Sequence, residues 1–163
     1  MAVVTSKKKK PAGAKEPQGS RIDEQLMPPG KYEVTPEHTF DVEIHLSNKD
    51  GRWIVVKGPG KNVDTHKLVF RMWTYEEMID IKKRVTVFDN TKRIHTIDQD
   101  HMNQLKVQKF LMSWTFDRDN PRLKLHRVQG VLTDESWHWF VQLQTNIITY
   151  ILEKMNEILE YNG

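Results

Sequence analysis

Histidines and paired carboxylates are the side chains of this sequence that could bind a metal or move protons. None of the seven histidines has another histidine four residues away on a predicted helix, and no H-E-x-x-H pattern occurs, so the spacing required for a zinc site is missing. General acid–base catalysis requires carboxyl groups whose surroundings separate their pKa values. The carboxylate pairs instead stand at predicted helix starts or turns, where capping explains them. These pairs are Glu76 with Glu77, Asp98 with Asp100, and Asp117 with Asp119.

Nucleophilic and phosphate-binding chemistry also lacks its usual patterns. Ser136 has no surrounding glycine elbow, and the sequence contains no cysteine, which excludes a thiolate nucleophile and a disulfide framework. The loop from Gly58 to Asn62 is shorter than a P-loop and lacks the final Lys-Ser/Thr pair. We therefore expect no catalytic activity, no cofactor and no metal site.

The C-terminal third of the chain predicts two helices with one apolar side. Thr133 can accept a hydrogen bond from a first-turn amide, and Asp134 and Glu135 suit the positive end of a helix. The polar stretch 142–146 interrupts the apolar stripe, which predicts a short helix over 134–143 and a second over 145–160. The stripe must be covered by the rest of the chain, a second copy or a partner protein. Its members are Trp137, Phe140, Val141, Ile147, Ile148, Ile151, Leu152, Met155, Ile158 and Leu159.

Aromatic residues are the strongest candidates for a protein contact. Trp137 and Trp139 are two positions apart, so a helix cannot bury both on the same side, and at least one should face another chain. Large rings commonly act as energetic centres of interfaces. The predicted partner-binding residues are Trp114, Trp137, Trp139, Phe140, Ile147 and Ile151.

Period-two patterns before residue 74 predict strands. Val42, Ile44 and Leu46 alternate with polar residues, turn-forming residues follow at 47–51, and a β-rich run continues over 52–57. A third strand is predicted over 68–73. A hairpin alone is barely stable, so we expect three antiparallel strands with a helix packed on them.

Two further helices are predicted between the strands and the C-terminal third. Thr74 and Glu77 form a capping-box pattern at the start of a helix that should end near 88–90. Thr96 or Asp98 can cap a second helix that continues to Trp114, before the turn at 117–121. The predicted fold class is α+β: a small three-stranded antiparallel sheet in the N-terminal half packed with a C-terminal bundle of about four helices. Residues 31–163 should form a single domain, β-rich over 38–73 and helical over 74–161.

The first 30 residues differ in composition from the rest and predict a disordered basic arm. Residues 1–20 contain five lysines and one glutamate, a net charge of +4 that leaves −1 for residues 21–163 of the total +3. Nucleic-acid binding is therefore not expected of the folded part and could only use the arm, at Lys7, Lys8, Lys9 and Lys10. No apolar stretch suits a signal peptide or a membrane span, so we expect a protein of the cytoplasm without a membrane partner.

The last 60 residues or so carry a pattern that resembles the tail assembly chaperones of tailed bacteriophages. It comprises Leu105-Lys106-Val107-Gln108, Ser113-Trp114, Asp117, the run from Gly130 to Ser136, Phe140 and a closing amphipathic helix. The resemblance implies a non-enzymatic role in the host-cell cytoplasm, in which the chain binds the tape-measure protein and keeps its long apolar helices soluble during tail assembly. The lysine-rich arm and the N-terminal strands are not required by that role.

Two alternatives remain open beside the chaperone interpretation. The chain could be a structural virion protein of the tail or neck that forms part of a ring. It could also be a nucleic-acid-associated protein acting through its lysine-rich arm, in which case its affinity should fall steeply with salt. A second copy of the chain, in a homo-oligomer, is a further candidate partner.

Overall fold

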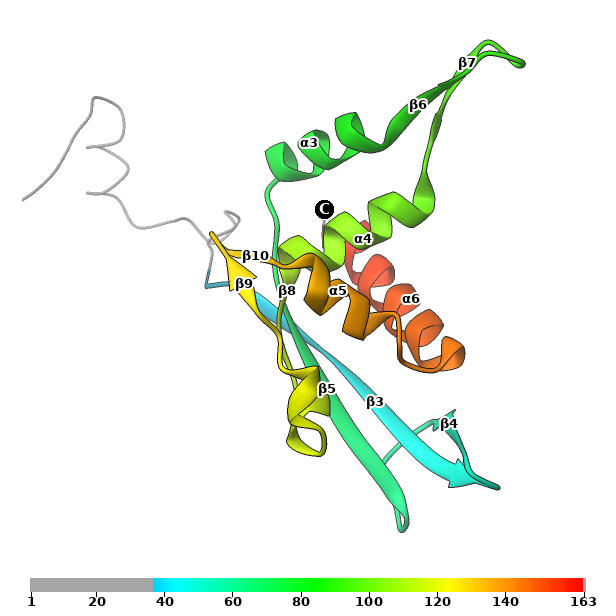
Figure 1. Ribbon diagram of the computed structural model, residues 1–163, viewed down its shortest axis with the longest axis vertical. Helices are drawn as coiled ribbons and strands as arrows, with labels where there is room; N and C mark the ends of the chain where they lie inside the picture. Colours follow the sequence, from blue (N-terminus) through cyan, green and yellow to red (C-terminus); the bar gives the residue numbers. More distant parts are fainter. Residues whose placement is uncertain (1–36, 163) are drawn as a thin grey trace, which may run out of the picture. The chain divides into compact units, whose positions relative to one another are not determined.

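A computed structural model describes residues 37–162, which form a mixed α/β fold with four α-helices and a four-stranded antiparallel sheet (Figure 1). The predicted basic arm, including Lys7 to Lys10, lies outside the described residues. The prediction of mixed strands and helices is confirmed at this level. The detailed prediction of a three-stranded sheet followed only by helices is wrong, because a fourth strand joins the sheet and a two-stranded ribbon interrupts the helical half.

The main sheet contains β3 (Thr39–Lys49), β4 (Arg52–Val56), β5 (Val63–Arg71) and β8 (Leu111–Trp114), in the order β4-β3-β5-β8. Asp50 and Gly51 connect β3 to β4 with φ values of 55° and 81°. Positive φ at both central residues matches the twist of a two-residue hairpin turn, and glycine adopts it without a Cβ clash. The predicted turn between the first two strands is therefore confirmed.

Strand alternation gives the sheet one buried and one exposed face. Val42 lies opposite Leu68 and Phe40 opposite Phe70, so these side chains share the face that the helices cover. On the other face, Asp41 and Lys67 form an exposed ion pair with an N–O distance of 3.7 Å. The alternation of Val42, Ile44 and Leu46 read from the sequence thus correctly identified the buried side of β3.

The fourth strand is the first departure from the predicted fold. Residues 111–114 were expected to end a helix, but α4 (Gln99–Phe110) stops at Phe110 and the chain continues as β8 along the open edge of β5. A bulge leaves Met112 without a partner in the ladder, while Leu111 pairs with Phe70 and Trp114 with Leu68. Because of this extra residue, both Leu111 and Trp114 face the core, at 0% and 4% exposure.

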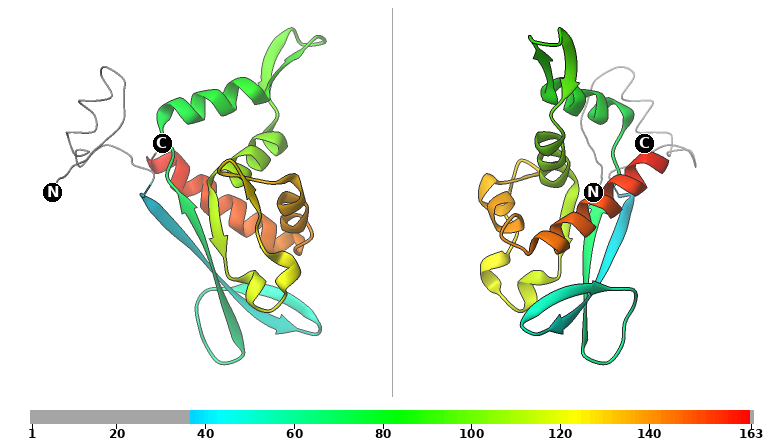
Figure 2. Two further views of the ribbon diagram at one scale, coloured as in Figure 1. Left: turned by 60° about the vertical axis from the view of Figure 1, so that its left-hand side comes forward. Right: turned by 90° about the vertical axis from the view of Figure 1, so that its right-hand side faces the viewer.

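The second departure is a two-stranded ribbon that interrupts the helical half. The first predicted helix was expected to reach 88–90, but α3 (Tyr75–Val85) ends at Val85. Then β6 (Thr86–Asp89) pairs with β7 (Ile94–Ile97), and the ribbon extends away from the sheet (Figures 1 and 2). The Asp89 carboxylate accepts hydrogen bonds from the amides of Thr91 and Lys92, which stabilises a turn instead of another helical turn.

The remaining helices cover one face of the sheet. The closing helix α6 (Thr145–Asn162) crosses it diagonally, and α5 (Asp134–Phe140) lies beside α4 (Figure 2). Between β8 and α5 lie two 3-10 turns, at Phe116–Arg118 and Pro121–Leu123, and the short pair β9 (Arg127–Val128) and β10 (Val131–Leu132). The predicted caps are present, since Thr133 accepts from Ser136 N and Asp98, not Thr96, accepts from His101 N.

Candidate functional site

A cleft of about 970 Å³ lies between α3, α4 and α6. These helices belong to different parts of the chain, and the ribbon β6–β7 connects two of them. Ligand sites in proteins are commonly concave and of this size, with an apolar lining and a few polar groups. The cleft is therefore the strongest candidate for a functional site in the described part of the chain.

The lining of the cleft is mainly apolar at depth. Trp73 and Met102 are buried, at 2% and 6% exposure, while Met78, Ile79 and Leu152 are half-buried. The Trp73 ring packs at 5.3 Å from Phe110, and its indole nitrogen has no hydrogen-bond partner among residues 37–162. Methionine side chains are flexible and polarizable, so they adapt to differently shaped apolar partners.

The rim of the cleft carries unlike charges on opposite helices. Lys82 of α3 and Glu153 of α6 are both exposed, and neither forms an ion pair with another described residue. Glu157, one turn further along α6, lies 3.5 Å from Lys154. A ligand in the cleft would thus meet a positive side on α3 and a negative side on α6.

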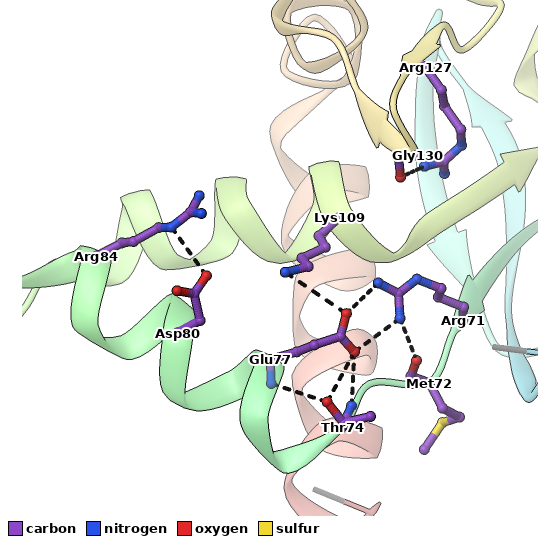
Figure 3. A network of polar contacts seen from close by, with 9 residues as sticks. All are labelled: Arg71, Met72, Thr74, Glu77, Asp80, Arg84, Lys109, Arg127 and Gly130. Carbon is purple, nitrogen blue, oxygen red and sulfur yellow. Dashed lines mark hydrogen bonds and ion pairs between the residues drawn. The ribbon is translucent and has the colours of Figure 1, made fainter. Parts of the chain in front are cut away.

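A polar network fixes the first turn of α3 at one side of the cleft (Figure 3). Glu77 Oε2 lies 2.6 Å from Arg71 Nη2, and Glu77 Oε1 accepts from Arg71 Nη1 at 3.1 Å and from the Thr74 amide at 3.0 Å. Thr74 in turn accepts from Glu77 N, which completes the predicted capping box. Burial raises the pKa of Glu77, but the hydrogen bonds from Arg71 and Thr74 and the charges of Arg71 and Lys109 outweigh it and leave this pKa below its ordinary value.

A second network joins α4 to α6 on the other side of the cleft. Lys106 is only 6% exposed, and its Nζ donates to Asn156 Oδ1 at 2.8 Å. Asn156 Nδ2 then donates to Asn103 Oδ1 at 3.2 Å. Buried polar groups that are hydrogen-bonded restrict how two helices can pack. This network therefore holds α4 and α6 at a fixed spacing, while α3 is held by its capped first turn and by Ile81 and Val85, which are buried in the core.

Four of the six predicted partner-binding residues lie in the hydrophobic core. The indole nitrogen of Trp114 donates to the Leu123 carbonyl at 2.8 Å, and its ring stacks at 6.2 Å on Phe140. Ile147 and Ile151 lie on the buried side of α6, at 4% and 0% exposure. The chain itself covers the deepest part of the C-terminal stripe, so these four side chains are not available on the surface.

The two remaining candidates, Trp137 and Trp139, are half-buried and point to different neighbours. Trp137 stacks on Phe140 at 5.2 Å. Trp139 lies under the guanidinium of Arg122, at 5.2 Å, and beside His138. Contact of these two tryptophans with another chain stays a prediction.

Sequence reasoning missed the cleft, although several of its residues were recognised as apolar. Met78 and Met102 lie within the two predicted helices, and Trp73 lies at the end of the predicted third strand. Their repeat spacing indicates which side of a helix is apolar, but not how far apart two helices pack. The opposite charges of Lys82 and Glu153 could indicate the cleft only if α3 and α6 were already known to line the same space.

Within residues 37–162, no group of three or more histidine, aspartate or glutamate side chains is arranged to hold a metal ion. Among the helices described, none is long and apolar enough to span a membrane. Comparisons of the whole chain with models of protein families, with curated proteins and with solved structures found no match.

Proposed function

We propose that this chain is a non-enzymatic assembly chaperone of a phage tail. In this proposal it acts in the host-cell cytoplasm and holds an amphipathic helix of the tape-measure protein in the cleft between α3, α4 and α6. The observation that carries the proposal is an adaptable apolar cleft whose rim bears opposite charges, at Lys82 and Glu153, that form no ion pair within residues 37–162. The resemblance of the last 60 residues to tail assembly chaperones supplies the identity of the partner.

The chemistry of the cleft favours a helix as the ligand. Recognition of a helix in a groove uses apolar anchors at three- and four-residue spacing, and Met78, Met102 and Leu152 offer the matching apolar contacts. A helix with acidic residues on one flank and basic residues on the other would place them against Lys82 and Glu153. Shielding the apolar side of such a helix would prevent its aggregation before the tail tube encloses it.

Co-expression with the tape-measure protein of the same phage tests the function. The soluble yield of the tape-measure protein should rise with the wild-type chain, and an unchanged yield would contradict the proposal. Mass spectrometry of purified phage particles separates a chaperone from a structural component. A chaperone should be absent, whereas a fixed copy number in finished particles would support the structural alternative instead.

Binding measurements with helical peptides that tile the tape-measure sequence test the cleft itself. Leu152→Asp should weaken binding by about tenfold to 150-fold, because burying a leucine contributes about 1.5–3 kcal/mol. Lys82→Glu should weaken it by only about threefold to tenfold, as expected for an exposed ion pair. Lys124→Glu is the matched control, since Lys124 is exposed and does not line the cleft. Equal affinities of all four proteins would exclude the cleft as the binding site.

A further inference from the structure

The ribbon β6–β7 presents apolar side chains on both of its faces. Phe88 pairs with His95 and Val87 with Thr96, so Phe88 and Ile97 lie on one face and Val87 and Ile94 on the other. All four apolar side chains are between 47% and 50% exposed. An isolated two-stranded hairpin is marginally stable in water. Its apolar faces and its two strands therefore indicate that another strand adds to the ribbon and enlarges the sheet.

In the described part of the chain, the outer edge of β7 has no strand beside it and lacks the usual protection against pairing. The only sheet partner of β7 among residues 37–162 is β6. Natural edge strands commonly carry lysine, proline or a bulge that prevents pairing with another chain. The four residues of β7 are Ile94, His95, Thr96 and Ile97, with no lysine, no acid and no proline. Because this edge has no fixed charge, a second copy of it meets no like-charge repulsion.

The hydrogen-bond pattern identifies which backbone groups point outward from β7. Asp98 N donates to the Val85 carbonyl at 2.8 Å, so the residues of this pair face each other across the ribbon. Hydrogen-bonded and non-hydrogen-bonded pairs alternate in an antiparallel ladder, so His95 and Ile97 belong to the non-hydrogen-bonded pairs of the ribbon. Their amides and carbonyls therefore point away from β6. Arg93 N already donates to Asp89 O at 2.7 Å.

We propose that β7 pairs antiparallel with β7 of a second copy of this chain, with a two-fold axis at Thr96. In this register His95 of one copy exchanges two backbone hydrogen bonds with Ile97 of the other, and the reciprocal pair does the same. The alternative register centred on His95 would require the Arg93 amide, which is already used within the turn. Pairing creates a four-stranded sheet in the order β6-β7-β7-β6 and extends the apolar faces across both copies.

The pairing uses the backbone of β7, whose Ile97 side chain also lines the cleft, and it does not depend on the proposed chaperone function. A standard stable interface buries about 800 Å² of surface on each partner. Four half-exposed apolar side chains on each copy would bury less surface than this. We therefore expect a weak, concentration-dependent dimer, with a dissociation constant on the order of micromolar or weaker.

Charge variants at the symmetry axis test both the pairing and its register. Thr96 of one copy would lie directly opposite Thr96 of the other, so Thr96→Lys places two positive charges together and Thr96→Glu two negative charges. Each variant alone should raise the dimerisation midpoint in sedimentation velocity of the full chain by about tenfold or more, because like charges directly opposite each other destabilise a strand pair. An equimolar mixture of the two should dimerise within about threefold of wild type.

Met112→Lys is the matched control, since Met112 is exposed on β8, an edge strand of the main sheet. It should leave the midpoint unchanged, and circular dichroism should show the same fold for all variants. A wild-type chain that stays monomeric up to about millimolar concentration would overturn the proposal. A dimer that is insensitive to both Thr96 variants, or that Met112→Lys dissociates, would overturn it too. If the equimolar mixture of Thr96→Lys and Thr96→Glu dimerised no better than either variant alone, the two-fold register at Thr96 would be overturned.

Discussion

Replacing Glu77 with alanine should remove the network that fixes the first turn of α3. The Glu77 carboxylate accepts two hydrogen bonds from Arg71 and one from the Thr74 amide (Figure 3). The side chains of the Arg71–Glu77 ion pair are 20% and 23% exposed, so the pair is shielded from much of the solvent. Without the carboxylate, Arg71 would lie against the Phe110 ring with its charge uncompensated by Glu77.

The magnitude follows from the interactions that are lost. A hydrogen bond to a charged group contributes about 1.5–3 kcal/mol, and the N-terminal cap of a helix about 0.5–2 kcal/mol. Because these terms share one carboxylate and are not additive, we expect Glu77→Ala to lower the free energy of unfolding by about 2–4 kcal/mol. Glu77→Gln keeps a carbonyl that can accept from the Thr74 amide, so its loss should be about half as large.

Urea denaturation at pH 7, followed by tryptophan fluorescence and circular dichroism, measures these losses. Glu76→Ala is the control, because Glu76 is the neighbouring exposed acid outside the network, and its effect should stay within about 0.5 kcal/mol. A loss below about 1 kcal/mol for Glu77→Ala, or one equal to that of Glu76→Ala, would refute the reasoning.

The dependence on pH gives an independent check of the same network. The pKa of Glu77 is lowered in the folded state from the ordinary 4.5, so its contribution to stability is present above pH 4.5. The contribution disappears as the pH falls through the lower folded-state pKa. The stability difference between wild type and Glu77→Gln should therefore shrink over this acidic range and not near neutral pH.

Three further predictions concern other parts of the fold. Burial, followed by the charge of Arg118, lowers the pKa of His66 from 6.5, so stability should fall as the pH drops below 6.5, and His66→Gln should reduce this dependence in thermal unfolding between pH 7.5 and 5.5. Ser136→Ala should cost about 1–3 kcal/mol in urea denaturation, because the fully buried Ser136 hydroxyl bonds both backbone groups of His126. Gly130→Ala should cost about 1 kcal/mol, because φ is +79° although no atom crowds the added Cβ, and an unchanged urea midpoint would contradict this.

The sequence by itself determined the features that depend on neighbouring residues. Alternation at Val42, Ile44 and Leu46 identified the buried face of β3, and the pair Thr74 and Glu77 identified the start of α3. The two closing helices were also predicted close to their observed bounds. These features follow from side-chain periodicity and from hydrogen bonds within one helical turn, so they need no knowledge of distant segments.

The tertiary structure alone decided the conformation of segments whose sequence suits a helix and a strand equally well. The apolar residues Leu111 and Trp114 suit either a helix or a strand, and the open edge of β5 selected the strand because it satisfies the backbone hydrogen bonds of both segments. Whether Trp114 and Phe140 would face a partner or each other depended on how α4, α5 and the sheet pack. The cleft lined by Met78 depends on how α3, α4 and α6 pack, and that packing rests on contacts between residues far apart in the sequence, such as Lys106 with Asn156.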